Sequence, residues 1–395
     1  MFFETSPHIP NQFVTQINGF SITIKREDLI HPQVSGNKFR KLKYNVQEAL
    51  TNGATALVTF GGAYSNHLAA TAAAGNALKI QTHGFVRGDE LEMKARNPTL
   101  TFCEAQGMQL HFMSRKAYRL KEQAEVFKAF LENNSTAYVI PEGGTNALAV
   151  KGCREIITSE DSNFTTICCP VGTGGTFSGL IQAAPEQEVL GFVVVQDPEI
   201  ADTVQSFVGI NKNWELLYEH GFGGYGAFPP ELITFINDFY EKYEILLDPL
   251  YTGKMLFGIF DMIEKGKFAK GSKILAIHTG GLQGILGMNM MLETKKMQLI
   301  MIIKIILSKI KGRVMTHSTL LLLSLLIACG DKDETTPEEA DADTDADTDA
   351  DTDADTDADT DADTDADTDA DPQTTAVIAT VSSDYATGSF STVDL

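Results

Sequence analysis

Ser35-Gly36-Asn37-Lys38 is the stretch of sequence that decides the fold. It follows an apolar, strand-like run from Phe20 to Ile24 and precedes an amphipathic pattern from Phe39 to Leu50 that predicts a helix. The glycine and asparagine make the stretch a turn. Most lysines are solvated surface charges, but a turn held between two packed elements fixes its side chain. Schiff-base chemistry requires such a fixed lysine, so Lys38 is the first candidate catalytic residue.

Short apolar runs and helical patterns alternate along the chain beyond this turn. The alternation predicts an α/β fold, with parallel strands and helices on both faces of the sheet. The expected strands are 56–60, 80–86, 108–113, 138–140, 167–171, 191–195 and 274–277. The expected helices are 68–77, 97–106, 115–133 and 230–242, and another begins at Phe177. All of them belong to one α/β body that ends near Lys295.

The net charge of −22 is concentrated in one part of the chain. Positions 330–395 hold 23 of the 53 acidic residues and one of the 31 basic residues, so positions 1–329 hold 30 of each. Because the front of the chain has no basic field, binding to nucleic acid is not expected. The 395 residues are enough for two domains and a large core.

The five cysteines lack the spacing of a metal site. Cys168 and Cys169 are adjacent in an apolar run, which is typical of buried thiols in a strand. No CxxC or CxxxC pair with histidine partners occurs, so no zinc or other metal site is expected. Nothing at the N-terminus resembles a signal peptide, so we expect the body to be cytoplasmic and reduced.

A glycine-rich loop, Gly172 to Thr176, follows an expected strand and opens an expected helix. Glycines let backbone N–H groups curl around an anion, and a helix N-terminus adds partial positive charge. The spacing fits neither the Rossmann fingerprint nor a Walker loop. The alternative is an ordinary tight turn. A phosphate cradle together with Lys38 favours pyridoxal 5'-phosphate (PLP) as the cofactor.

Ser65-Asn66-His67 stands where an expected strand ends and a helix begins, the usual place of ligand sites in α/β sheets. Taken alone, the serine and asparagine would more often cap the helix, and the histidine would more often be a packed imidazole. Tyr225 and Tyr251 would likewise more often be core or rim aromatics. Their significance comes from occurring together with the other loops.

Together these motifs resemble the 1-aminocyclopropane-1-carboxylate deaminase/D-cysteine desulfhydrase family, in colinear order over residues 1 to about 295. The motifs that carry the resemblance are Lys25-Arg26-Glu27-Asp28, Gly36-Asn37-Lys38, Ser65-Asn66-His67, Gly172 to Thr176, Asp248-Pro249-Leu250-Tyr251-Thr252-Gly253-Lys254 and His278-Thr279-Gly280-Gly281. The resemblance implies a homodimer with the tryptophan-synthase-β-like fold of PLP enzymes (fold type II), built from two three-layer α/β domains. A large PLP-binding domain, 1–45 with 146–295, would be covered by a small domain, 46–145.

The resemblance also implies roles for individual residues. Lys38 would carry the cofactor and move protons, Asn66 would bind its phenolic oxygen, and Thr279 its ring nitrogen. The phosphate would be held by Gly172, Thr173, Gly174, Gly175 and Thr176. Ser65 would bind the substrate carboxylate or act as a nucleophile. The substrate would also contact Asn66, His67 and the acid/base or pKa-tuning tyrosines Tyr225 and Tyr251.

Two threonines favour the desulfhydrase side of the family. Where the deaminases carry Glu and an apolar residue, this chain has Thr252 and Thr279. A threonine hydroxyl leaves the ring nitrogen neutral, which suffices to expel a thiolate but suits ring opening less well. We therefore expect α,β-elimination from D-cysteine or a related β-substituted amino acid, giving pyruvate, ammonia and sulfide. The alternatives are an aminocyclopropanecarboxylate deaminase, which forms 2-oxobutanoate and ammonia, and a non-catalytic PLP-binding protein.

The last hundred residues do not match this body. Residues 315–395 resemble the start of a bacterial lipoprotein, with a short apolar core before Cys329 and an acidic repeat. The favoured explanation is a joined neighbouring coding region. The alternative is a true fusion in which 297–329, within a hydrophobic segment at 296–330, meets a membrane. The Asp-rich tract within 331–374 is expected to be disordered, and 375–395 is unassigned.

Overall fold

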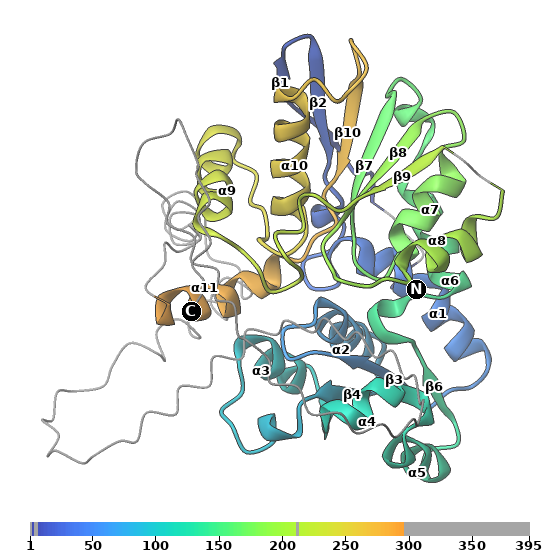
Figure 1. Ribbon diagram of the computed structural model, residues 1–395. Helices are drawn as coiled ribbons and strands as arrows, with labels where there is room; N and C mark the ends of the chain where they lie inside the picture. The colour runs from blue at the N-terminus through green and yellow to red at the C-terminus, as the bar shows by residue number, and fades with distance from the viewer. Residues whose placement is uncertain (1, 4–6, 211–212, 296–395) are drawn as a thin grey trace, which may run out of the picture. The chain divides into compact units, whose positions relative to one another are not determined.

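The computed structural model describes residues 2–3, 7–210 and 213–295, all within one compact unit of the chain. The predictions for 296–330, 331–374 and 375–395 lie outside the described residues. Strands in the described part form two sheets, one with the order β1-β2-β10-β7-β8-β9 and one with the order β5-β4-β3-β6 (Figure 1). None of the described helices is both long enough and apolar enough to cross a bilayer.

The larger sheet is parallel except at one edge. Its strands are β1 (Asn11–Ile17), β2 (Phe20–Lys25), β7 (Thr166–Val171), β8 (Glu188–Val193), β9 (Trp214–Leu217) and β10 (Lys273–Ile277). β1 and β2 are antiparallel and are joined at Asn18 and Gly19, both with positive φ, as expected for an Asn-Gly hairpin. The expected strand at 191–195 begins and ends earlier in the structure, at 188–193.

Helices cover both faces of the larger sheet (Figure 1). Ile274 and Ala276 of β10 pack in a core with α9 (Pro230–Tyr243) and α10 (Thr252–Glu264). Leu275 and Ile277, which point to the opposite face, pack in a second core with α7 (Gly175–Ala183) and α8 (Ile200–Val208). Successive β10 side chains therefore alternate between two buried layers, which confirms the prediction of an α/β sheet with helices on both sides.

The smaller sheet is parallel throughout. Its strands are β3 (Ala56–Gly61), β4 (Gln81–Arg87), β5 (Met108–Met113) and β6 (Ala137–Val139), and the helices between them are α2 (Asn66–Leu78), α3 (Pro98–Ala105), α4 (Arg115–Leu120) and α5 (Glu125–Asn133). The single helix predicted over 115–133 is wrong. Lys121 has φ 46 and ψ −116, which ends α4 and leaves a short 3-10 turn before α5.

The remaining elements lie between these strands and helices in the sequence or follow β10. They are α1 (Asn37–Thr51), α6 (Ala147–Cys153), α11 (Ile285–Thr294) and the 3-10 helices η1 (Glu27–Leu29), η2 (Asp89–Leu91), η3 (Lys121–Gln123), η4 (Glu142–Gly144), η5 (Arg154–Ile156), η6 (Ser159–Asp161) and η7 (Leu282–Gly284). α1 packs against α6 and carries the segment that follows the Ser35-Gly36-Asn37-Lys38 turn. The domain boundaries proposed at residues 45 and 146 stay a prediction.

Candidate active site

A cavity of about 840 Å³ opens where the parallel strands of both sheets end. Loops that follow β3, β4, β7 and β10 contribute to its wall, as expected for a ligand site in an α/β protein. Of the residues predicted for the site, it is lined by Lys38, Ser65, Asn66, His67, Gly172, Thr173, Gly174, Thr176, Tyr225, Tyr251 and Thr279. Gly175 does not line it and instead begins α7 behind the loop.

Lys38 is the second residue of α1, so the helix begins two residues earlier than predicted. Gly36 makes this start possible. It has φ 61, and a Cβ there would lie 2.0 Å from the carbonyl oxygen of Thr279. The same carbonyl accepts a hydrogen bond of 3.1 Å from the Asn37 N–H. Backbone contact between two loops therefore places Lys38, and only a glycine fits at the contact.

The surroundings of Lys38 prepare it to exchange protons at neutral pH. Burial lowers the pKa of Lys38 to about 7, and the positive charge of Lys41 adds to the effect. Its Nζ donates to Asn37 Oδ1 over 3.0 Å. An amine with such a pKa is partly neutral near pH 7, as a nucleophile or a general base requires.

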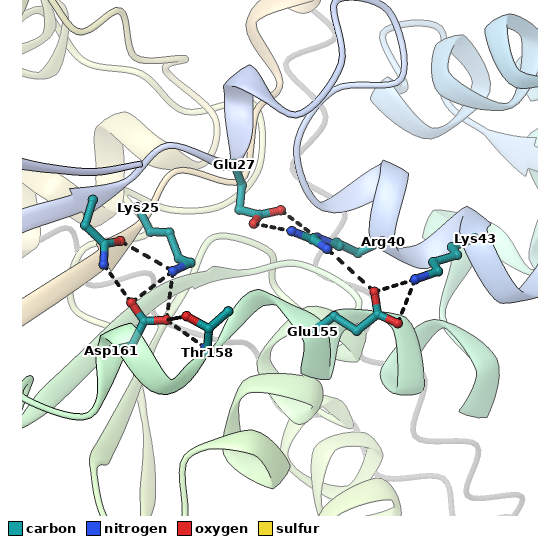
Figure 2. A network of polar contacts seen from close by, with 8 residues as sticks. Lys25, Glu27, Arg40, Lys43, Glu155, Thr158 and Asp161 are labelled. Carbon is teal, nitrogen blue, oxygen red and sulfur yellow. Dashed lines mark hydrogen bonds and ion pairs between the residues drawn. The ribbon is translucent and has the colours of Figure 1, made fainter. Parts of the chain in front are cut away.

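Buried ion pairs fix the helix that carries Lys38 (Figure 2). Arg40, two residues further along α1, donates to both carboxylate oxygens of Glu27 over 2.9 and 3.0 Å. Glu155 lies 3.6 Å from the other guanidinium nitrogen and pairs with Lys43. Such two-pronged contacts between buried charges specify geometry as well as binding. They hold α1 against η1 on one side and η5 on the other.

The glycine loop has the geometry of an anion cradle. Gly174 has φ 76 and forms the N-cap of α7, so the loop turns directly into a helix N-terminus. Asn37 donates to the Thr176 hydroxyl over 2.9 Å, which ties the loop to the start of α1.

Lys41 adds a positive charge that sequence reasoning missed. It lines the cavity, and its Nζ donates to Gly143 O, Thr145 Oγ1 and Thr173 Oγ1 over 2.8, 2.9 and 3.3 Å. Its buried ammonium contacts neutral oxygens only, and burial lowers its pKa. The available signal was its spacing, because a residue three positions after Lys38 lies on the same helix face.

Ser65 and Asn66 are positioned by backbone and side-chain contacts. The Ser65 hydroxyl oxygen caps α2 by accepting 3.2 Å hydrogen bonds from the His67 and Leu68 N–H groups. The interpretation of Ser65 as a helix cap is therefore correct. Its hydroxyl proton is still available to a ligand in the cavity. Asn66 Oδ1 accepts from Gln283 Nε2 over 2.6 Å, so the Asn66 amide group is oriented and can donate through Nδ2.

His67 is held as a neutral imidazole. The Thr59 hydroxyl donates to Ile140 O over 2.8 Å, so it accepts from His67 Nε2, which lies 2.8 Å away. Nδ1 is then the unprotonated nitrogen, and it is buried without a partner. Burial and the charges of Lys38 and Lys41 lower the pKa of His67 well below its usual value. These contacts favour a role in packing and orientation rather than in proton transfer.

Tyr225 and Tyr251 form a pair on the cavity wall, with ring centroids 5.7 Å apart at an interplanar angle of 71°. Tyr225 is 36% exposed, and desolvation of its hydroxyl at the cavity wall raises its pKa to about 12. Burial also raises the pKa of Tyr251. Both hydroxyls therefore stay protonated at neutral pH.

Comparison with known proteins identifies the chain. Residues 4–280 match the family described as "Pyridoxal-phosphate dependent enzyme". This chain belongs to that family. Similar proteins include the bifunctional D-cysteine desulfhydrase/1-aminocyclopropane-1-carboxylate deaminase of Arabidopsis thaliana, 32% identical over 68% of this chain and 74% of the relative. A D-cysteine desulfhydrase of Yersinia pestis is 32% identical over 67% of this chain and 87% of the relative.

Solved structures agree with this assignment. The chain resembles one described as an ACC deaminase homologue with a TM-score of 0.64 and 28% identity, over 74% of this chain and 95% of the other. A hydrogen sulfide-producing enzyme from Fusobacterium nucleatum shares the fold at 15% identity, with a TM-score of 0.53 over 72% of this chain and 98% of the other. The predictions of the deaminase/desulfhydrase family, of PLP fold type II and of a PLP-dependent enzyme are confirmed.

The cavity of this PLP enzyme fits its cofactor. A half-buried lysine of lowered pKa lies in the same cavity as a glycine cradle with a second lysine beside it, as an aldehyde carrying a phosphate dianion requires. The cavity also holds an oriented amide at Asn66 and a hydroxyl at Thr279.

Thr252 does not lie where a residue near the cofactor's ring nitrogen would be expected. It is fully buried and does not line the cavity, and its hydroxyl donates to Asp248 Oδ2 over 2.6 Å. The Asp248 carboxylate also accepts from the N–H groups of residues 250–252, at 3.0, 2.7 and 3.0 Å. Thr252 thus helps Asp248 to fix the backbone of Tyr251 at the start of α10, and only Thr279 still supports the argument about the ring nitrogen.

Proposed function

We propose that this enzyme catalyses α,β-elimination from D-cysteine or a closely related β-substituted amino acid. In the reaction the Cα–H and C–S bonds break, and the imine that follows takes up one water. D-cysteine and water thereby give pyruvate, ammonia and hydrogen sulfide. The observation that carries the proposal is Thr279, a hydroxyl rather than a carboxylate in the cavity wall, on the loop that contacts the start of α1.

Residues of this chain have distinct places in binding the cofactor. Lys38 would hold it covalently, Lys41 and the 172–176 loop its phosphate, Asn66 its phenolic oxygen and Thr279 its ring nitrogen. When bound, PLP supplies an electron sink that makes the α-proton of an amino acid acidic. With a neutral hydroxyl at the ring nitrogen, the electron sink would be weaker than with a carboxylate there. The weaker sink would suffice, because a thiolate is a good leaving group.

Other residues would bind the substrate and move protons. The Ser65 hydroxyl and the Asn66 amide would bind its carboxylate from the start of α2. Lys38 has a pKa of about 7, so it would accept the α-proton at neutral pH and return one later. Tyr225 would donate a proton to the departing sulfur, since its hydroxyl stays protonated at neutral pH with a pKa of about 12.

The test supplies PLP and D-cysteine to the purified full-length chain and measures sulfide and pyruvate. We expect equal amounts of both from D-cysteine and less of both from L-cysteine. β-Chloroalanine and D-serine contain no sulfur, so they are compared with D-cysteine through pyruvate alone. Aminocyclopropanecarboxylate is assayed in parallel through 2-oxobutanoate. If 2-oxobutanoate forms and D-cysteine gives no sulfide, ring opening is the activity. If the lysine adduct absorbs normally and no substrate reacts, the protein binds PLP without catalysis.

We also infer that the body acts as a cytoplasmic homodimer of two-domain protomers. Reduced, buried thiols at Cys103, Cys153, Cys168 and Cys169 support a reducing compartment. The division into 1–45 with 146–295 and 46–145 is supported by the two separate sheets. Light scattering coupled to size exclusion tests the dimer, and a mass of one protomer would contradict it. A membrane partner is proposed only for a chain in which 297–329 is retained.

A further inference from the structure

Lys254 is a buried lysine on α10, three residues after Tyr251. Its side chain is fully buried, and its Nζ donates to Gly221 O over 3.0 Å and to Gly224 O over 2.6 Å. Burial lowers the pKa of Lys254 to about 8, and the Asp248 carboxylate partly opposes this shift. Placing an ammonium group in the interior opposite two neutral carbonyls is costly. The cost directs attention to the segment that carries the two carbonyls.

The two carbonyls belong to the loop that carries Tyr225. Phe222, Gly223 and Gly224 all have positive φ, at 54, 91 and 126°. Such a segment loses much conformational freedom when it is ordered, because glycines are unrestricted in the unfolded chain. Gly224 N–H donates to Gly221 O over 3.0 Å, so the carbonyl that accepts from Lys254 also closes the turn just before Tyr225.

Further contacts attach the same loop to its surroundings. His220, just before the loop, lies 2.8 Å from Asp261 on the next turns of α10. Gln196 Nε2 donates to Gly223 O over 2.8 Å. Lys254 is nevertheless the group that contacts both ends of the 221–224 turn, and it does so from the helix whose N-cap is Tyr251.

We propose that Lys254 is the positioning residue that holds the 221–225 loop on α10, so that Tyr225 meets Tyr251 at the cavity. The start of α10 then positions both tyrosines. Tyr251 is its N-cap, and Lys254, three residues later, holds the loop that carries Tyr225. The effect of Lys254 on turnover rests on the proposed function of Tyr225, whereas its effect on the loop does not.

Hydrogen–deuterium exchange on the full-length chain tests the anchor without any activity. Lys254→Met keeps the length of the side chain and removes its donors, and Lys267→Met removes an exposed lysine beyond the same helix as the control. We expect amides of 219–226 to exchange at least tenfold faster in Lys254→Met, with β7 unchanged and the control like wild type. Unchanged exchange in the loop, or faster exchange throughout the protein, would overturn the proposal. If Lys254→Met does not fold, Lys254→Gln replaces it and should give an intermediate increase.

A double-mutant cycle with Tyr225→Phe tests the consequence for catalysis. We expect Lys254→Met to lower kcat about 10- to 100-fold in the wild-type background and less than about twofold in Tyr225→Phe, because the anchor has nothing left to position. Independent, multiplicative losses would mean that Lys254 acts elsewhere. If the wild-type enzyme makes no sulfide, the proposed function fails, while the exchange experiment still decides whether Lys254 anchors the loop.

Discussion

Two lysines on one face of α1 divide the tasks of the cavity between them. Lys38 carries a depressed pKa and contacts Asn37, while Lys41 contacts the hydroxyls and the carbonyl around the glycine cradle. They also influence one another, since the charge of Lys41 helps to lower the pKa of Lys38. Lys41 would thus bind the phosphate directly and would affect proton transfer indirectly, through the pKa of Lys38.

Lys41→Met should separate these two effects. Losing a charge-assisted hydrogen bond should raise the Kd for PLP about 10- to 100-fold. Removing the positive neighbour should also raise the pKa of Lys38, so the acidic limb of the pH–rate profile should move to higher pH. Spectroscopic PLP titration measures the first effect, and kcat against pH measures the second, because the Lys38 amine is free only once substrate is bound. Lys267→Met is the control, because that lysine is exposed and does not line the cavity. An unaltered Kd with Lys41→Met would exclude a role in phosphate binding.

At the scale of elements, β4 and β5 carry an imidazole pair that should make stability depend on pH. His83 Nδ1 lies 3.0 Å from His111 Nε2, and His83 Nε2 is buried without a partner. Burial, with His111 adding to it, lowers the pKa of His83 to about 4. Between about pH 6.5 and 4 the unfolded chain therefore binds more protons than the folded one, and stability falls as the pH falls.

Replacing His83 by Leu should reduce this dependence. The free energy of unfolding of the wild type should drop by about 1–3 kcal/mol more than that of the variant between pH 7.5 and 4.5. Urea denaturation at the two pH values measures the difference. Gln109→Leu, at an exposed position of β5, removes no titratable group and should leave the slope unchanged. Equal slopes for the wild type and His83→Leu would show that the pair does not resist protonation.

Sequence patterns predicted the strands that form clear apolar runs and missed the strands of mixed, half-buried residues. β10 and β3 were predicted because their residues are almost all buried and apolar. β1 is an edge strand of mixed, half-buried residues, and β9 has only four residues, so neither gives a clear period. Lys121 breaks a helix without any glycine or proline to predict it. The motif residues of the site were found, and Lys254 stood in one of these motifs without a role. The contacts that Lys41 and Lys254 make are with distant loops, which no local pattern contains.

At the scale of the whole described body, the cavity draws its wall from both sheets, so ligand binding should stabilise both. Arg87 at the end of β4 and Val171 at the end of β7 both line it. A ligand that binds only the folded state at 100 times its Kd adds about 2.7 kcal/mol of stability. PLP should therefore raise the melting temperature by several degrees. Pyridoxal, which lacks the phosphate, should do so far less at the same concentration.

The distribution of this stabilisation distinguishes a bridging ligand from one held by the large sheet alone. Hydrogen exchange with and without PLP should show slower exchange at the ends of both β4 and β7. The Lys38→Ala variant loses the covalent attachment but keeps the phosphate cradle, so protection should persist near β7 and weaken near α2, where Asn66 would contact the ring. If PLP protected β7 alone in the wild-type enzyme, the cofactor would not contact the small sheet, and Ser65 and Asn66 could not bind a substrate attached to it.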